Sequence, residues 1–264
     1  MINSSENITS VHMNKNYSAN EVRHLNIYPS MQSSVSGQYE STNFQELVKR
    51  IKEVHEGVIY FIDTRKDTHF VLNNSVVCLK ADDNSQLTAG QIIQKEAQLV
   101  NNLLGKMLTF KSNRLEDRQE EVTSSSTIQQ FVEDKKYWGM HLYLRFALER
   151  FGPPNDSEVD AYLLLLEKIK NENAWLHANS VVGGDAAMLL IVMEDLLANA
   201  AHQPLNEILV KHGRSGDFLK TPKEDDENAS KKIDRAAFLE KFHMFAKNRS
   251  EHSLSWSEWK TRFK

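Results

Sequence analysis

The chain has 264 residues, of which 40% are hydrophobic and 26% are charged, and its formal net charge is −4. This composition can bury a core, and it excludes a collagen-like chain, a low-complexity chain and a disulfide scaffold. The charge also excludes the strongly basic surface of a protein that binds nucleic acid broadly. Because Cys78 is the single cysteine, an intrachain disulfide and a multi-cysteine metal site are excluded as well.

The first twenty residues are rich in Asn, Ser and Thr and contain no apolar segment of the kind found in secretory signal peptides. We expect residues 1–20 to form a disordered polar tail, with a non-cleaved export signal of a bacterial effector as the alternative. The apolar runs of the chain have eight residues or fewer, whereas a membrane-spanning helix needs about 20. The sequence therefore predicts a soluble protein that is cytoplasmic when synthesised.

The first half of the chain alternates between helical and extended patterns. Residues 44–54 have apolar side chains at helical spacing, and residues 58–63 form a short apolar run typical of a buried parallel strand. Residues 76–79 predict a second short strand. A helix is expected to begin after Thr88, its N-cap, and the polar residues 112–127 are expected to form a surface connection.

The second half continues the alternation with a strand predicted at residues 141–148. Asp156 or Ser157 is expected to cap the helix that follows. Residues 174–178 form a short apolar segment, and residues 186–193 are apolar on nearly every side, as in a helix at the centre of a fold. Strands that alternate with helices predict an α/β architecture.

A strand, a loop and a buried helix follow one another over residues 175–187. Free backbone N–H groups and the positive end of the helix dipole converge where a loop enters a helix, so such a unit can bind an anion. The spacing alone, however, favours a tight turn without a ligand over a phosphate site.

This unit resembles the phosphate-binding loop and the following helix of the protein-tyrosine-phosphatase-like inositol phosphatases, the bacterial cysteine phytases. The matching residues, in one ungapped register, are Trp175, Leu176, His177, Gly183, Met193, Asp195, Leu197 and Asn199. Further blocks resemble the family in the same order along the chain: residues 63–73, residues 145–160, residues 205–209 with Lys211 and Gly216, and two C-terminal segments near Phe238 and Trp256. The resemblance covers roughly residues 40–264.

The resemblance implies a tyrosine-phosphatase-like α/β fold, with a central, mostly parallel sheet flanked by helices and a small N-terminal strand-containing subdomain. It implies one domain over residues 21–264. The N-terminal part of this domain is expected at about residues 40–110, and its phosphate-loop core is expected at residues 128–264.

The chain departs from the family at three positions on which the family's reaction depends. Ser180, preceded by Asn179, stands in place of the thiolate nucleophile. Ala186 stands in place of the arginine that binds the phosphoryl oxygens, and Arg150 stands in place of the aspartic acid that protonates the leaving group. Losing an equivalent arginine can cost roughly 10³–10⁵ in rate. We therefore expect no catalytic residues, and we predict a pseudophosphatase that acts as a binding or regulatory module.

Asp185 stands where the family has a glycine. A carboxylate about 5 Å from a phosphoryl group would repel it by roughly 3 kcal/mol per charge at an effective dielectric of 20. Asp is also a preferred N-cap residue. We expect Asp185 to cap the helix itself, so that the loop satisfies its own N–H groups.

A residual anion pocket is one interpretation of the positions that remain. Its residues would be Arg65, Arg145, Ser180, Gly183 and Lys211, and it would hold an inositol phosphate without cleaving it. The alternative is that the two arginines serve the structure by pairing with carboxylates such as Asp63. Cys78 lies outside the loop, and we expect it to be a small buried hydrophobic residue.

An active phosphatase is the competing interpretation. It would use Ser180 as the nucleophile, with Glu149 or His177 as a helper, and Arg145 or Arg150 would replace the missing arginine. We instead expect His177 to be buried and structural. A regulatory subunit that pairs with an active relative is a third possibility. No cofactor, metal or nucleic acid is expected. A protein partner is expected, as is secretion into a host cell without a cleaved signal peptide.

Overall fold

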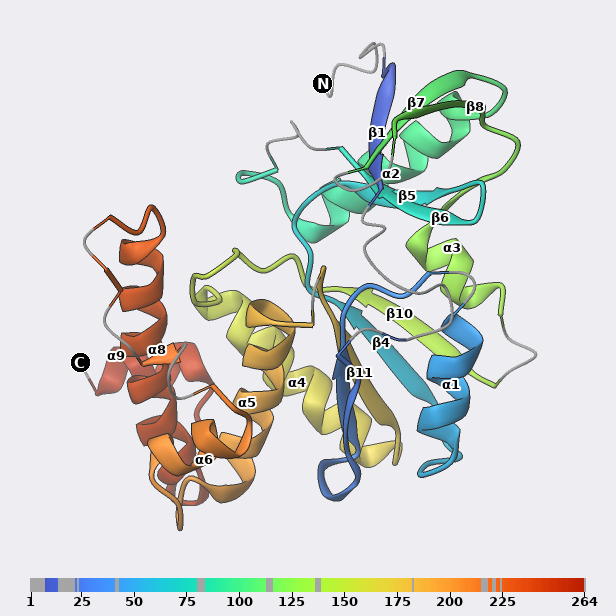
Figure 1. Cartoon of the computed structure of the whole chain (residues 1–264). Helices are drawn as coiled ribbons and strands as arrows, with labels where there is room; N and C mark the ends of the chain where they lie inside the picture. Colours follow the sequence, from blue (N-terminus) through green and yellow to red (C-terminus); the bar gives the residue numbers. More distant parts are fainter. Residues whose placement is uncertain are drawn as a thin grey trace.

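The computed structural model describes residues 8–13, 22, 24–40, 43–79, 84–112, 116–135, 139–181, 183–214, 218–219, 222–223 and 225–263. Residues 1–7 and 14–20 of the expected tail lie outside the described residues, as does Gly216. The described residues form two sheets with helices packed on both (Figure 1). None of the helices among them is long and apolar enough to cross a membrane.

A five-stranded sheet forms the centre of the fold, and its strand order is β10-β4-β11-β3-β2. In that order the strands are His141–Arg145, Ile59–Asp63, Trp175–Asn179, Ser33–Ser36 and Asn26–Tyr28. The first four are parallel, and β2 runs antiparallel to β3. The buried parallel strand predicted at residues 58–63 is confirmed, because every residue of β4 is buried between two parallel neighbours.

Helices cover both faces of this sheet (Figure 1). On one face lie α1 (Phe44–Lys52) and α3 (Ile128–Glu133). The other face packs against a larger helical layer, which consists of α4 (Asp156–Asn171), α5 (Asp185–Asn199), α6 (Leu205–Lys211), α8 (Ala229–Lys247) and α9 (Trp256–Arg262). Two short 3-10 helices, η1 and η3, span Pro29–Met31 and Arg249–Glu251.

The α5 helix lies at the centre of this helical layer, as its sequence predicts. All seven residues from Ala187 to Met193 are buried, and α5 contacts β3 and β11 on one side and α6 and α8 on the other. A helix buried on every side is held in place by its apolar surface. The loop before α5 therefore rests on a rigid support.

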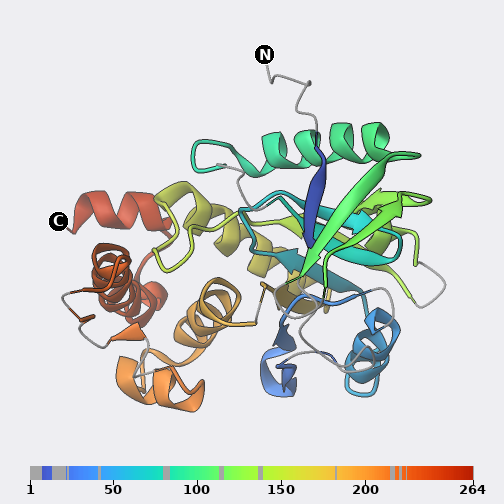
Figure 2. The same cartoon turned by 45° about the horizontal axis from the view of Figure 1, so that its top comes forward.

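A second, six-stranded sheet has the order β8-β7-β1-β6-β5-β9. In that order the strands are Arg118–Glu121, Met107–Ser112, Ser10–Met13, Ser75–Cys78, His69–Leu72 and Ser125–Thr127. Figure 2 shows α2 (Ala89–Leu103) lying over this sheet, with the C-terminal helices grouped elsewhere on the molecule. The α2 face of the sheet forms its own apolar cluster.

Three expectations for this region are corrected. Within the expected tail, Ser10–Met13 forms β1 between β6 and β7, because Val11 and Met13 alternate with polar residues and bury their side chains in the core of this sheet. Within the expected surface connection, residues 118–121 and 125–127 form the two edge strands. Cys78, the last residue of β6, is partly rather than fully buried, contrary to the expectation.

Capping boxes start α2, α3, α4 and α9, and the expected cap of α4 is corrected. Thr88 caps α2, as predicted, and accepts the N–H of the third helical residue in a capping box. The N-cap of α4 is Asn155 rather than Asp156 or Ser157. Asp156 is already helical, and its carboxylate instead accepts hydrogen bonds from Lys260.

Candidate functional site

Four buried polar side chains form a row across the carboxyl ends of four parallel strands. Arg145 of β10 is paired in register with Asp63 of β4, Asp63 with Asn179 of β11, and Asn179 with Ser36 of β3. Each of these residues is at most 7% exposed. Because directly paired residues of a parallel sheet point to the same face, the four side chains lie side by side. In open α/β sheets, ligands bind at the carboxyl ends of the strands, so this edge is the candidate site.

The loop that follows Asn179 is held against the neighbouring strand. The N–H of Ser180 donates to the carbonyl of Ser36 at 3.3 Å, and the N–H of Gln38 donates to the carbonyl of Val181 at 3.4 Å. Ser180 and Val181 are partly exposed. The loop therefore runs along the segment after β3 and keeps one side open.

Gly183 allows the loop to approach this segment closely. Its φ is +69°, which favours glycine. A Cβ atom at this position would lie 2.7 Å from the backbone nitrogen of Gly37 and 2.7 Å from the carbonyl carbon of Ser36. Only glycine fits here without a shift of backbone atoms.

Asp185 does not cap α5, contrary to the expectation. The N-cap residue is Gly184, and no side chain caps the helix there. Asp185 is the first helical residue, and its Oδ1 accepts a hydrogen bond from Nη1 of Arg235 at 3.2 Å. The Arg235 side chain is 2% exposed, and its guanidinium lies 4.3 Å from the centre of the Phe218 ring. A buried guanidinium attracts the carboxylate away from the helix N–H groups.

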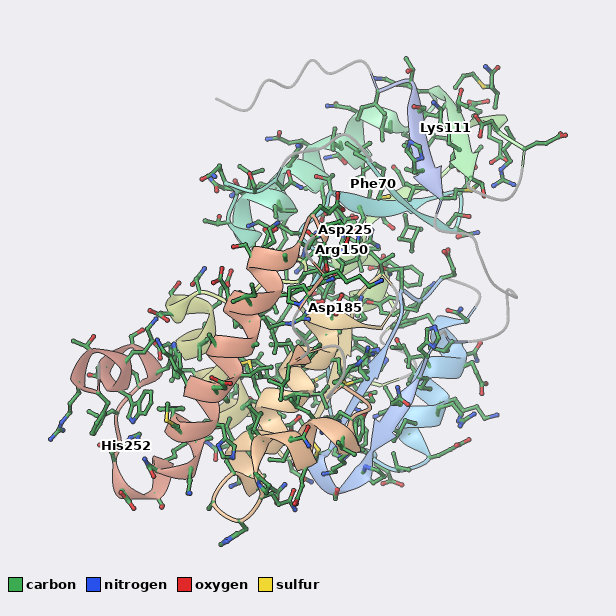
Figure 3. All side chains as sticks on the ribbon, turned by 60° about the vertical axis from the view of Figure 1, so that its left-hand side comes forward. Phe70, Lys111, Arg150, Asp185, Asp225 and His252 are labelled. Carbon is green, nitrogen blue, oxygen red and sulfur yellow. The ribbon has the colours of Figure 1, made fainter. Side chains whose placement is uncertain are left out.

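The residues at the expected acid position are engaged elsewhere. Arg150, which is labelled in Figure 3, is exposed. Its guanidinium lies 4.7 Å from the centre of the Phe151 ring. The carboxylate of Glu149 forms ion pairs with Lys231 at 2.6 Å and with Lys66 at 3.7 Å. Glu149 thus joins three separate segments of the chain, and both of its carboxylate oxygens have a cationic partner.

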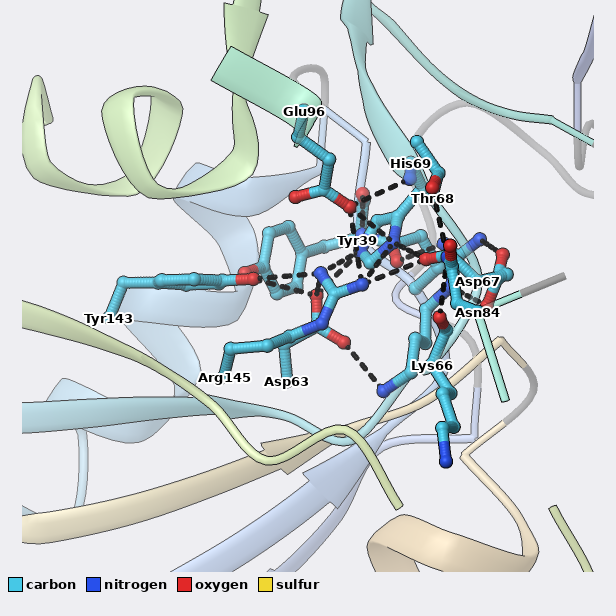
Figure 4. Close-up of polar contacts among 12 residues, drawn as sticks. Tyr39, Asp63, Lys66, Asp67, Thr68, His69, Asn84, Glu96, Tyr143 and Arg145 are labelled. Atoms are coloured by element: carbon cyan, nitrogen blue, oxygen red, sulfur yellow. Dashed lines mark hydrogen bonds and ion pairs between the residues drawn. The ribbon is translucent and has the colours of Figure 1, made fainter. Parts of the chain in front are cut away.

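Asp63 is the centre of a buried network of charged and polar groups (Figure 4). Its Oδ2 accepts hydrogen bonds from His69 at 2.6 Å, from Tyr143 at 3.1 Å and from Arg145 at 3.5 Å. Burial alone would raise the pKa of Asp63, but His69 and Arg145 hold it well below its usual range. His69 belongs to the six-stranded sheet and the others to the five-stranded sheet, so the network joins the two sheets.

Both arginines of the expected anion pocket are bound to carboxylates of the chain. Nη2 of Arg145 donates to Oε1 of Glu96 at 3.2 Å and to the carbonyl of Asp67 at 2.8 Å. Nη2 of Arg65 pairs with Oδ2 of Asp67 at 2.5 Å, and its Nη1 donates to Oε1 of Gln38 at 2.6 Å. Arg145 thus reaches Asp63 and Glu96, whereas Arg65 pairs with Asp67 rather than with Asp63.

His177 belongs to a continuous line of hydrogen bonds beneath the loop. Trp175 donates to Oγ of Ser34 at 2.8 Å, and Ser34 lies 2.8 Å from Nδ1 of His177. Nε2 of His177 lies 3.1 Å from Oγ of Ser36, which donates to the carbonyl of Gly37. Burial lowers the pKa of His177 to about 3. The imidazole is therefore neutral, and both of its nitrogens are used by the two serines.

Lys211 is separated from the rest of the expected pocket. Its Nζ pairs with Oδ2 of Asp195 at 2.8 Å. Asp195 follows Asp185 by ten residues in the same helix, which places it about 15 Å further along the helix axis. The structure brings Arg65 and Arg145 to the strand ends near Ser180 and Gly183, but it does not bring Lys211 there.

No protein-family model and no curated protein sequence matches the chain. Solved structures do resemble it. The PTP-like myo-inositol phosphatase from Mitsuokella multacida, solved in complex with myo-inositol-(1,3,4,5)-tetrakisphosphate, superposes with a TM-score of 0.82 at 20% identity, over 96% of this chain and 49% of that one. The PTP-like phytase from Bdellovibrio bacteriovorus superposes with a TM-score of 0.75 at 24% identity, over 95% of this chain and 93% of that one. The chain has the fold of the PTP-like phytases.

This PTP-like phytase fold confirms the expected α/β class and, at the level of fold, the resemblance. A third structure, the tandemly repeated protein tyrosine phosphatase like phytase from M. multacida, superposes with a TM-score of 0.78 at 20% identity, and 96% of this chain and 49% of that chain are covered. The chain therefore spans about half the length of the two Mitsuokella proteins.

Proposed function

We propose that the chain is a catalytically inactive pseudophosphatase with the PTP-like phytase fold, which acts as a binding or regulatory module. The observation that carries this proposal is the chemistry of the loop between β11 and α5. Ser180 stands in this loop, and Asp185 and Ala186 are the first two residues of α5, where the resemblance calls for a thiolate, a glycine and an arginine. The loop therefore has neither a strong nucleophile nor a guanidinium of its own for phosphoryl oxygens.

The neighbouring guanidiniums do not replace the missing arginine. Arg65 and Arg145 have side chains that are at most 1% exposed, and each has a carboxylate partner. Arg235 lies close to the start of α5, but it is paired with Asp185. A phosphate monoester at the loop would have to compete with these carboxylates for every one of the three arginines, and it would meet the charge of Asp185 as well.

Ser180 also has no base to activate it among the contacts of the described residues. A serine hydroxyl becomes a nucleophile only when a neighbouring group takes its proton. His177 directs both ring nitrogens at serines of β3, and Glu149 bridges two lysines. These contacts support the inactive module over a phosphatase that works through Ser180.

The assay that tests this proposal measures release of inorganic phosphate from inositol hexakisphosphate, from myo-inositol-(1,3,4,5)-tetrakisphosphate and from a phosphotyrosine peptide. The expected result is no release by the wild-type chain above that of the Ser180→Ala variant. Turnover by the wild-type chain that disappears in Ser180→Ala would overturn the proposal and establish the serine phosphatase instead.

The partner that we propose for the module is a protein, in the setting of a bacterial effector secreted into a host cell. The Asn-, Ser- and Thr-rich composition of residues 1–20 supports this setting. An inositol phosphate is the small-molecule alternative, because one of the similar structures holds such a ligand. A ligand at 100 times its dissociation constant adds about 2.7 kcal/mol of stability. A thermal shift with inositol phosphates would therefore favour the small molecule, and no shift would favour the protein.

A further inference from the structure

Three buried polar side chains beside Asp63 have hydrogen-bonding atoms without a partner among the described residues. These atoms are the hydroxyl of Tyr39, both amide atoms of Asn179 and Nε of Arg145. Tyr39 and Asn179 are 0% exposed, as is the side chain of Arg145. Buried polar groups nearly always bond to protein or to ordered water, so unpaired atoms on three neighbouring side chains call for an explanation.

The three side chains share one neighbourhood. Arg145 and Asn179 flank Asp63 in the register of the parallel sheet, one on each side, and all three point to the same face. The ring of Tyr39 packs edge-on against Phe61, with 5.8 Å between the ring centres, and Phe61 precedes Asp63 by two residues on that face. Figure 4 shows Tyr39 among the same side chains as Asp63 and Arg145.

The charges of this neighbourhood are already matched by partners within the chain. The carboxylate of Asp63 accepts from His69 and Arg145, and the carboxylate of Glu96 accepts from Arg145. The atoms that remain unpaired are a hydroxyl, an amide and one guanidinium N–H. This set offers both donors and acceptors to a ligand, and it requires neither a cation nor an anion.

We propose that Tyr39, Asn179 and Arg145 bound a buried hydration site next to Asp63, beneath the loop that begins at Ser180. Water fits this set of groups, because it can accept from the Asn179 amide and from Nε of Arg145 and can donate to the Tyr39 hydroxyl and to the amide oxygen. Buried waters in proteins typically make about three such bonds. The site fixes the side chain of the last residue of β11, and thereby the start of the loop.

A double-mutant cycle of Tyr39→Phe and Asn179→Leu tests the site by urea unfolding of the full chain. If the two side chains share water, each variant lowers the unfolding midpoint, and the double variant loses less than the sum of the two losses. Tyr162→Phe is the matched control, because the buried Tyr162 hydroxyl has its own partner, the carbonyl of Leu190 at 2.9 Å. The loss in unfolding midpoint of Tyr162→Phe is expected to add to that of Asn179→Leu.

Two outcomes of this cycle overturn the proposal. One is strict additivity of Tyr39→Phe and Asn179→Leu, which means that the two side chains share no water. The other is a higher midpoint for Asn179→Leu, which is expected if the amide is buried without any partner.

A crystal structure of the wild-type chain provides a test that does not depend on any variant folding. At a resolution that shows ordered water, we expect a water peak within about 3 Å of the Asn179 amide and of the Tyr39 hydroxyl. Clear density for both side chains without such a peak contradicts the hydration site.

Discussion

The guanidinium of Arg235 lies 3.2 Å from the carboxylate of Asp185, although fifty residues separate the two in the sequence. This ion pair joins the α8 helix to the first residue of α5, directly after the loop at the carboxyl end of β11. It thereby occupies an arginine that contacts the residue directly after the loop. Each of the three guanidiniums near the loop, those of Arg65, Arg145 and Arg235, therefore has a carboxylate partner.

Asp185→Asn should lower the free energy of unfolding by about 1–2 kcal/mol, because it leaves the buried guanidinium of Arg235 with a weaker acceptor. Glu167→Gln is the matched control. Glu167 also pairs with an arginine, Arg249, at 3.1 Å, but its side chain is 60% exposed, and such pairs contribute only about 0–1 kcal/mol. Urea unfolding of both variants measures the difference. Equal losses of unfolding free energy in the two variants would mean that burial of Arg235 does not strengthen its ion pair with Asp185.

Gly183→Ala should destabilise the chain more than Gly105→Ala. Both glycines have a positive φ, +69° and +77°, so both variants bear the left-handed backbone cost of roughly 1–2 kcal/mol. Only Gly183 has backbone atoms within 2.7 Å of the added Cβ, whereas a Cβ at Gly105 meets nothing within 4 Å. The additional loss, about 1–3 kcal/mol, is measured by chemical unfolding. Indistinguishable losses would show that the loop does not rest on residues 36–37.

Asp63→Asn should be strongly destabilising, by about 3–5 kcal/mol, because it leaves the buried side chain of Arg145 without one of its carboxylate partners. Tyr143→Phe removes one hydrogen bond to the same carboxylate and should cost only about 1 kcal/mol. Guanidinium chloride unfolding compares the two. Similar small losses for both would contradict the idea that Asp63 organises the network between the sheets.

Stability should fall as the pH decreases from about 6.5. Burial lowers the pKa of His177 to about 3 and that of His141 to about 4, whereas an unfolded histidine titrates near 6.5. Between these values each histidine binds more protons in the unfolded chain than in the folded chain, so the contribution of the two histidines to stability is complete above pH 6.5 and declines below it. In His141→Phe, part of this decline should disappear between pH 6.5 and 4. Parallel pH profiles of the wild type and the variant would rule out this role for His141.

Much of the fold follows from local patterns in the sequence. The apolar run that became β4 and the all-round apolar helix α5 predict a buried strand and a central helix, and both are found. The β1 strand was missed because four residues of alternation in a polar stretch give a weak signal. The cap of α4 was misplaced because Asn155, Asp156 and Ser157 are all good N-cap residues, and only tertiary contacts separate them.

The site was harder to predict because its partners come from distant parts of the chain. No local pattern connects Arg235 to Asp185, and the position of Lys211 beside Asp195 depends on how α6 packs on α5. The sequence does contain a signal for the buried position of Glu96. It stands in the stripe of α2 that also contains Ile92 and Val100, both buried, and a carboxylate in such a stripe indicates a buried charge partner.

The most direct test of the inactive module is the initial rate of phosphate release from inositol hexakisphosphate. It should be measured side by side for the wild type, for Ser180→Ala, and for a variant that combines Arg150→Asp, Ser180→Cys, Asp185→Gly and Ala186→Arg. We expect that the rate of the wild type does not exceed that of Ser180→Ala, and that the rate of the combined variant exceeds both once circular dichroism shows that it is folded. A wild-type rate that is clearly above that of Ser180→Ala would mean that the chain is an active phosphatase.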